Sequence, residues 1–383
     1  MKNKILTGFL LVLIGGWGSL SAQNVGSNYA RQVNTLIGTK GVGLTSGYLY
    51  PGATYPYGMV QFTPSYFSKR SGFVINQLSG GGCEHMGNFP TFPVKGKLKM
   101  SPDNILNYRI NISEEKGHAG YYEAKVQEDI HAKLTVTERT GMASYEYPAD
   151  QQYGTVIIGG GISATPIEQA AIVITAPNKC EGYAEGGNFC GLRTPYKVYF
   201  VAEFDTDALE SGTWKRNELK PNTTFAEGEY SGVYFTFDVD KKKNVQYKIG
   251  VSYVSVENAR ENLKAENTGW DFLQIQNQAE SKWNHYLGKI EVEGTNPDRT
   301  TQFYTHLYRS FIHPNVCSDV NGEYMGADFR VHKSRSKHYT SFSNWDTYRT
   351  QIQLLSILDP EVASDIVISH QLFAEEAGGA FPR

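Results

Sequence analysis

The sequence lacks several features that would assign it to common functional classes. Its 36 Lys and Arg against 39 Asp and Glu residues leave a net charge of -3, so no positive excess is available for nucleic acid or an anionic membrane. It has only four cysteines in 383 residues, with no CxxC motif and no Cys/His ladder, which argues against a zinc site. The glycines of LSGGGC, residues 78–83, have neither a P-loop lysine nor dinucleotide-binding spacing, which disfavours phosphate binding.

Long apolar segments are also absent. The amino terminus has Lys2 and Lys4, a short apolar run over residues 5–14, and small residues that end at Ser21-Ala22. This order is typical of a cleavable signal peptide over residues 1–22. The run is too short to span a bilayer comfortably, and no cysteine follows the cleavage point to carry a lipid. We therefore expect an exported protein, periplasmic or secreted, without a membrane anchor.

The region 23–256 has the pattern of a β domain. Alternating segments such as YYEAKVQED, KVYFVAEF and VQYKIGVSYVS recur between clusters of Gly, Asn, Asp and Pro. Many short strands without long helices between them predict an antiparallel β-sandwich. Residues 33–94 differ, because they are rich in Gly, Pro and aromatics, and loops of such length are usually functional.

After residue 256 the period becomes helical. In the predicted helical linker 257–296, Trp270, Leu273, Trp283 and Leu287 are spaced for one buried face,. Residues 297–383 then read as the first helices of an α domain, interrupted by a predicted hairpin over 320–341. Another amphipathic helix is expected from Trp345, Tyr348, Ile352 and Leu355. Because so few helices bury their apolar faces poorly, and because the sequence stops after the loop-like GGAFPR, we expect the α domain to be incomplete.

The stretch SFSNWDT, residues 341–347, has two interpretations. In the simple one, Asp346 caps a helix, where the helix dipole favours a carboxylate, and Trp345 packs in the core. In the functional one, Trp345 lies against a pyranose ring while Asp346 accepts hydrogen bonds from sugar hydroxyls, which suits a carboxylate. The 25 Tyr and 19 Phe residues carry the same ambiguity, because rings serve both β-rich cores and sugar stacking.

The cysteines and histidines give weaker signals. Cys180 and Cys190 bracket a glycine-rich loop that a disulfide could close, and this pairing is left open. Nothing local pairs Cys83, and a nucleophilic role for it would need a His partner. His85 and His118 are interpreted as surface or loop residues rather than ligands.

Several carboxylates are candidates for acid-base work, but spacing pairs none of them. The candidates are Glu84, Asp319, Glu323, Asp328, Asp346, Glu375 and Glu376.

Several stretches, in order along the chain, resemble glycoside hydrolase family 92, the exo-acting, calcium-dependent α-mannosidases. They are VNTLIG, YPGATYPYGMVQFTP, QLSGGGC, GHAGYYEAKV, LTVTERTGMASYEYP, KIGVSYVSVENARENL, FYTHLYRSFIHPN, FSNWDTYRTQ and GGAFPR. The matches run from residue 33 to the last residue. Each motif is weak alone, but the ordered set is specific.

The resemblance implies an N-terminal antiparallel β-sandwich followed by the start of an incomplete (α/α)6 helical barrel, with the active site between them. It implies inverting hydrolysis of terminal α-linked mannose in mannose-containing glycans, with calcium as the cofactor. Trp345 and Asp346 match the pocket for the terminal mannose. The loop with Gly82, Cys83 and Glu84 matches a contribution from the sandwich side. Because Cys83 to Met86 depart from the aromatic-bearing loop of many α-1,2-specific members, linkage preference is not carried over.

By the same resemblance, the catalytic acid, the base and the calcium ligands come later than the last residue here. The catalytic residues are therefore unassigned, no metal ligand is named, and the chain alone is expected to be inactive. Two alternatives stay open: a non-catalytic mannose-binding module, and an inert fragment of a truncated gene.

Overall fold

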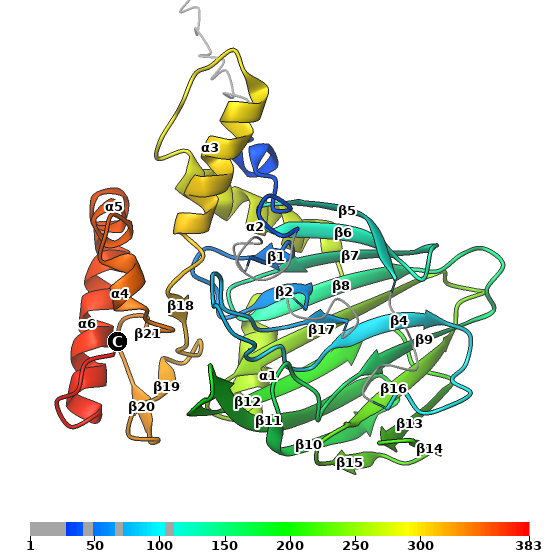
Figure 1. Cartoon of the computed structure of the whole chain (residues 1–383). Helices are drawn as coiled ribbons and strands as arrows, with labels where there is room; N and C mark the ends of the chain where they lie inside the picture. The colour runs from blue at the N-terminus through cyan, green and yellow to red at the C-terminus, as the bar shows by residue number, and fades with distance from the viewer. Residues whose placement is uncertain (1–27, 41–48, 66–71, 104–110, 383) are drawn as a thin grey trace, which may run out of the picture.

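The computed structural model describes residues 28–40, 49–65, 72–103 and 111–382. The predicted signal peptide, residues 1–22, lies outside this range. Two large antiparallel sheets form a sandwich, and helices follow it in the chain (Figure 1). The predicted N-terminal β-sandwich followed by helices is confirmed, and the strands give way to helix between Ser252 and Val256.

The first sheet has eight strands. In spatial order they are β1 (Ala53–Thr54), β2 (Gln61–Pro64), β3 (Phe73–Val74), β4 (Thr91–Lys95), β9 (Tyr153–Ile158), β16 (Ser231–Asp238), β13 (Glu210–Lys215) and β14 (Glu218–Pro221).

The second sheet has nine strands, and its last strand along the chain, β17, lies in its middle between β12 and β8. The order is β15 (Phe225–Glu227), β10 (Ile167–Ala176), β11 (Lys179–Phe189), β12 (Leu192–Phe204), β17 (Asn244–Ser252), β8 (Thr140–Glu146), β7 (Ile130–Val136), β6 (Tyr121–Val126) and β5 (Ile112–His118).

The core between the sheets follows from the alternation in the sequence. In β6 every second side chain is buried, namely Tyr122, Ala124 and Val126, as expected for a strand with one covered face. Rings from both sheets meet there, as when Phe204 of β12 packs beside Phe235 of β16 at 4.9 Å between centroids. The largest fully buried side chains are all Trp, Tyr or Phe. Many of the aromatic side chains therefore lie in the core.

One 3-10 helix, η1, and six α-helices complete the described chain. Their bounds are η1 Tyr29–Gln32, α1 Val256–Glu266, α2 Phe272–Leu287, α3 Pro297–Ser310, α4 Asn344–Thr347, α5 Gln351–Leu358 and α6 Pro360–Glu376. Between α3 and α4 lie two short antiparallel pairs, β18 (Asn315–Val316) with β21 (Tyr339–Thr340), and β19 (Glu323–Met325) with β20 (Val331–Lys333). The second pair confirms the hairpin predicted over 320–341.

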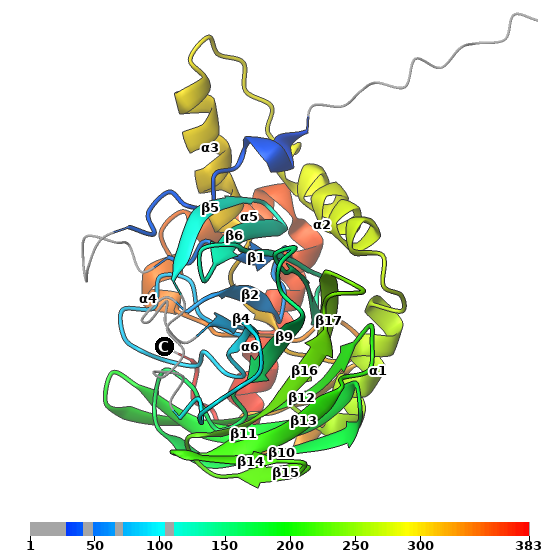
Figure 2. The ribbon, with the colours of Figure 1, turned by 90° about the vertical axis from the view of Figure 1, so that its right-hand side faces the viewer.

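The helices cover the sandwich from one side and extend beyond it. Helix α1 packs on β17 and β12, and α2 packs on β6, β7 and β8, so both lie along one flank of the sandwich in Figure 2. Helices α5 and α6 pack on each other and stand apart from the sandwich, with β18 to β21 on their sandwich side (Figure 1). Among the described residues, no helix has the length and apolarity needed to cross a membrane.

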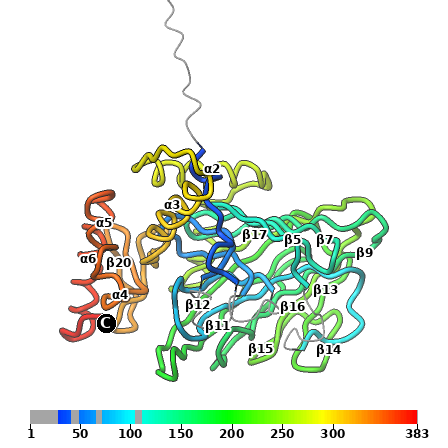
Figure 3. The backbone as a smooth tube through the Cα atoms, turned by 45° about the horizontal axis from the view of Figure 1, so that its top comes forward, coloured from blue at the N-terminus to red at the C-terminus, as the bar shows by residue number. Residues whose placement is uncertain are grey.

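The amino-terminal segment belongs to the helical core as much as to the sandwich. Element η1 packs on α2 and α3, where Figure 3 shows the blue tube passing beside them. The Tyr57 ring lies edge-on to three rings of the helical half, those of Tyr286, Phe311 and Tyr339, at 5.7 to 6.0 Å. The division into 23–256, 257–296 and 297–383 remains a prediction, and these contacts fix the two halves to each other.

Two details of the helix prediction are wrong. Leu273 was expected on the buried face of α2 but is 59% exposed, because the buried face is formed by Ile275, Ala279 and Trp283. The expected single helix from Trp345 to Leu355 is two helices, α4 and α5. They are separated at Thr350, whose φ of 70° lies in the left-handed region and cannot continue an α-helix.

Candidate functional site

The Trp345–Asp346 turn does not have the cap-and-pack arrangement that the sequence also allowed. Helix α4 is one turn long, and its N-cap, Ser343, makes no side-chain hydrogen bond to the backbone. The Ser343 hydroxyl instead donates to Asp346 Oδ2 at 2.6 Å. The Trp345 side chain is 72% exposed. The turn therefore presents an open indole face next to an oriented carboxylate, the pair of groups that the sugar-binding interpretation requires.

Backbone geometry and side-chain contacts hold this turn in place. Ser341 and Thr350, on either side of α4, both have left-handed backbones, with φ of 63° and 70°. Such conformations are unfavourable for residues with a Cβ, and they concentrate at functional sites. Asn344 donates to the Pro382 carbonyl at 2.8 Å, and Gln351 donates to the His313 carbonyl at 3.0 Å.

The charge around Asp346 leaves it free for a ligand. Burial lowers the pKa of His313 to about 4, although the nearby Asp346 charge acts in the opposite direction. The ring is therefore neutral at physiological pH. No ion pair joins Asp346 to a basic side chain within the described residues. Among the described residues, the side chain that hydrogen-bonds to this carboxylate is that of Ser343.

The glycine loop, residues 78–85, lies on the sandwich side, and hydrogen bonds of the His85 ring with Leu78 and Cys83 hold it closed. His85 Nε2 accepts from the Leu78 amide at 2.8 Å, and its Nδ1 lies 2.6 Å from the Cys83 carbonyl, so Nδ1 carries the proton. Burial lowers the pKa of His85, which keeps this neutral tautomer. A Cβ at Gly81 would lie 2.7 Å from the His85 ring, so that close approach requires glycine. Gly82 and Glu84 face solvent.

The structure does not form the Cys180–Cys190 disulfide that the sequence left open. Cys190 bonds to Cys83, with 5.4 Å between their Cα atoms, and Cys180 and Cys317 are free and buried. Cys180 lies near the start of the extended strand β11, and Cys190 follows its last residue. Because a strand rises about 3.3 Å per residue, the two cysteines are far apart and do not bracket a loop. Cys83 consequently offers no thiolate, which excludes the nucleophilic role.

The two histidines differ from their predicted settings. His85 lies in a loop as predicted but is buried, with 4% exposure. His118 is a strand residue of β5, and its Nε2 lies 3.5 Å from Glu280. The described residues contain no group of three or more His, Cys, Asp or Glu placed to hold a metal ion.

The predicted sugar-binding residues form two groups. Gly82, Cys83 and Glu84 share one loop of the sandwich, and Trp345 and Asp346 share α4. No hydrogen bond or ion pair joins the two groups within the part of the chain that the structure describes. Any ligand that uses both must span the junction between the sandwich and the helices.

That junction contains a network of buried charges that the sequence analysis missed. Arg139, at the tip of the β7–β8 hairpin, is 7% exposed. Its guanidinium lies 2.7 Å from both Glu138 and Glu266, and its Nε donates to the Ser318 carbonyl at 2.7 Å. Lys337 donates to the other oxygen of Glu138. The ERTG turn was visible in the sequence, but its partners lie more than a hundred residues away.

Most of the candidate carboxylates have structural partners. Asp319 accepts from Ser252, Asn258 and Asn262 at 2.6 to 2.8 Å, and burial raises its pKa in spite of these bonds. The others are held by neighbours: Glu323 by Asn258, Asp328 by His332, Glu375 by Gln371, and Glu376 by Tyr324. Two pairs of these carboxylates are neighbours: Asp319 and Glu323 share the Asn258 amide as a donor, and Asp328 and Glu376 both lie beside Gly326. We assign neither pair as an acid and a base.

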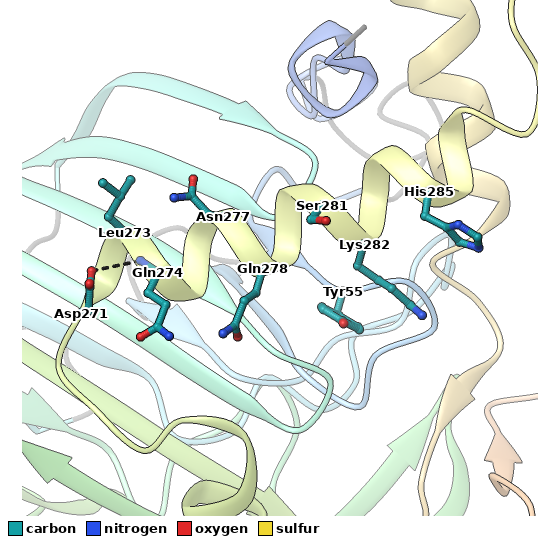
Figure 4. A pocket seen from close by; sticks show the side chains of 9 residues that line it. All are labelled: Tyr55, Asp271, Leu273, Gln274, Asn277, Gln278, Ser281, Lys282 and His285. Atoms are coloured by element: carbon teal, nitrogen blue, oxygen red, sulfur yellow. Dashed lines mark hydrogen bonds between the residues drawn. The ribbon is translucent and has the colours of Figure 1, made fainter. Parts of the chain in front are cut away.

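Two pockets on the described surface are lined by none of the predicted sugar-binding residues. One of about 650 Å³ runs along α2 and is lined by polar side chains of that helix and by Tyr55. Figure 4 shows these side chains along one side of α2, with Tyr55 beneath Lys282. A second, of about 760 Å³, lies beside the Trp345–Asp346 turn and is lined by Tyr348, Arg349 and Ile357 among others. It borders the candidate site.

These features describe an antiparallel β-sandwich followed by helices, with an exposed indole next to a carboxylate on α4. The Glycosyl hydrolase family 92 N-terminal domain matches residues 32–252, and the Glycosyl hydrolase family 92 catalytic domain matches residues 258–383. The chain therefore belongs to glycosyl hydrolase family 92. The expectation that the catalytic half is missing needs correction, because residues 258–383 match the catalytic domain itself.

Similar proteins share both halves. A family GH92 alpha-mannosidase from Bacteroides thetaiotaomicron superposes with a TM-score of 0.83 and 25% identity, covering 93% of this chain and 50% of that one. Its structure is also known in complex with mannoimidazole. A family GH92 inverting mannosidase from the same organism has a TM-score of 0.78 and 24% identity, covering 91% of this chain and 49% of that one.

A curated relative, an uncharacterized secreted glycosidase of Arthroderma benhamiae, is 26% identical over 89% of this chain and 48% of its own length. The chain thus spans about half the length of the relatives that it matches.

Proposed function

We propose that this protein is an exported glycosidase that removes terminal α-linked mannose from glycans. The observation that carries the proposal is the exposed Trp345 indole next to the Asp346 carboxylate, which the Ser343 hydroxyl orients, in a chain of family 92. The alpha-mannosidase whose fold it shares supports mannose as the sugar. Export is supported by the signal-peptide pattern and by a relative described as secreted.

Each residue of the turn has a distinct task in this proposal. Trp345 provides an apolar surface for the C–H face of the terminal pyranose ring. Asp346 accepts hydrogen bonds from sugar hydroxyls, and these bonds are strong because the acceptor is charged. The Ser343 hydroxyl keeps Asp346 in one rotamer, which lowers the entropy lost on binding. Gly82 and Glu84 contribute from the other side of the junction.

The proposed reaction is inverting and calcium-dependent. An inverting glycosidase needs a carboxylic acid on the leaving oxygen and a carboxylate base on a water, about 6.5–9.5 Å apart. The described carboxylates are mostly held by structural partners, so we assign neither role to them. Calcium, when bound, would supply a Lewis acid next to the sugar.

The occupied carboxylates favour a second candidate function for these 383 residues by themselves, which is mannose binding without turnover. The two candidates differ in one measurement: release of mannose from α-linked mannobioses, with calcium and with a chelator. Calcium-dependent release by the 383-residue chain supports the enzyme. Binding of methyl α-D-mannopyranoside without release supports the binding module.

The site itself is tested with Trp345→Ala and Asp346→Asn. Either change should weaken binding of methyl α-D-mannopyranoside at least tenfold. The matched control is Phe329→Ala, which removes an aromatic ring of similar exposure, 67%, from the β19–β20 turn. Equal affinity in the wild type and both site variants would exclude this turn as the sugar site.

A further inference from the structure

The glycine loop is attached to a second element that the sugar-binding interpretation did not include. That element is the β11–β12 hairpin, in which Asn188 pairs with Arg193 and Phe189 with Leu192. The two residues between these pairs, Cys190 and Gly191, both have positive φ, 53° and 82°. This is the geometry of a tight two-residue turn of type I′.

Cysteine is an unusual choice at this position of the turn. A type I′ turn needs positive φ at both central residues, and Asn, Asp or Gly adopt it at the lowest cost. Cys190 takes the left-handed conformation and uses its side chain to reach Cys83 of the glycine loop. The position is therefore better explained by the cross-link than by the turn.

Further contacts join the same two elements. Phe189, next to Cys190, lies edge-on to the His85 ring with 5.6 Å between centroids. Tyr196, in β12, donates to Asn88 at 2.7 Å, immediately after the loop. His85 closes the loop from inside through Leu78 and the Cys83 carbonyl. The loop is thus held once by its own histidine and once by the hairpin.

We propose that Cys190 and His85 are positioning residues of the sugar site. They fix the glycine loop so that Gly82 and Glu84 face the terminal sugar without reorganising when it binds. This inference rests on the proposed function, because it assigns a task to the loop only if the loop contacts the sugar. A loop that is free to move would have to be ordered by the ligand, which weakens binding without changing the chemical step.

The test compares wild-type protein with the double variant Cys83→Ser/Cys190→Ser. We expect the dissociation constant, or KM, for methyl α-D-mannopyranoside or an α-mannobiose to rise at least tenfold, with kcat changed less than twofold where turnover is measurable. Hydrogen exchange at the Leu78 amide, which His85 protects, should become at least tenfold faster. His85→Phe keeps the ring against Phe189 but loses both hydrogen bonds, and should give the same pattern.

Two controls separate this effect from general damage. Cys180→Ala removes a free buried thiol at the other end of β11, and Arg193→Gln removes an exposed ion pair with Glu168 beside the hairpin tip. Both should leave sugar affinity within twofold of wild type. If the double variant fails to fold, dithiothreitol on the folded wild type replaces it: two electrons and two protons convert the disulfide to two thiols, and dithiothreitol becomes its cyclic disulfide.

The outcomes are distinguishable. If exchange at the Leu78 amide becomes faster but the affinity for the mannoside is unchanged, the disulfide holds the loop but the loop does not contribute to sugar binding. That result overturns the inference. Unchanged exchange would show that the disulfide does not hold the loop, which also overturns it. A wild-type protein that binds no mannoside would overturn the proposed function, and this inference with it.

Discussion

Arg139 and Glu266 form a two-point contact between the sandwich and the helices. The guanidinium Nη1 lies 2.7 Å from Glu266 Oε1, and the Arg139 backbone amide donates to Glu266 Oε2 at 2.8 Å. One carboxylate at the end of α1 therefore holds both the main chain and the side chain of the β7–β8 turn. The two halves meet through specific groups in addition to apolar packing.

Replacing Arg139 by Met should destabilise the protein by about 3–5 kcal/mol, because Glu266 and Glu138 would stay buried without their shared cation. Unfolding in urea, followed by fluorescence, measures this change. The control is Arg193→Gln, which breaks an exposed ion pair whose arginine is 70% exposed and should change the stability far less. Similar losses in the two variants would mean that the Arg139 network adds little.

Acidification should destabilise the folded protein through His338. This ring stacks on Tyr324 at 3.7 Å, and burial lowers its pKa to about 4. A histidine in the unfolded chain titrates near 6.5, so the unfolded state binds the proton first as pH falls. Stability is then lost between about pH 6.5 and 4, by about 2 kcal/mol at pH 5 relative to pH 7.5.

The variant His338→Phe keeps the stacked ring without the titrating group, so its loss of stability over this range should be smaller by about the same 2 kcal/mol. Urea unfolding at pH 5 and 7.5 measures both profiles. His306→Gln, at an exposed position, should retain the wild-type profile. An unaltered pH dependence in His338→Phe would exclude this histidine as the source.

Thr350→Gly should stabilise the protein by about 0.5–1 kcal/mol. A left-handed backbone costs a residue with a Cβ roughly 1–2 kcal/mol, and the flexibility of glycine in the unfolded chain offsets part of the gain. The Thr350 side chain makes no capping bond that would be lost. Ser356→Gly, within α5, should instead destabilise by about 0.5 kcal/mol. A lower midpoint for Thr350→Gly in urea would contradict the strain interpretation.

Local sequence pattern was sufficient to predict much of this fold. Alternation in segments such as residues 121–126 predicted strands and their buried faces, because a strand with one covered face imposes a period of two. The hairpin over 320–341 was also correct. The exposed indole of Trp345 agrees with the functional one of its two interpretations and not with packing in the core.

The predictions that failed depend on partners that are distant in the sequence, or on backbone conformations that composition does not reveal. Cys190 pairs with Cys83 across 107 residues, and no local spacing encodes that choice. Arg139 likewise contacts Glu266 and Ser318, which are far from it in the sequence. The break between α4 and α5 depends on the left-handed Thr350, a residue type that gives no warning of such a turn.

The order of the nine-stranded sheet has a consequence for how the chain can be divided. Strands β5 to β8 and β10 to β12 form two meanders, and β17, the last sandwich strand in the sequence, pairs with both β8 and β12. A fragment that stops before Asn244 would leave both of those strands with unpaired backbone groups, which are ready templates for association with other chains. The shortest fragment suitable for expression of the sandwich must therefore include β17.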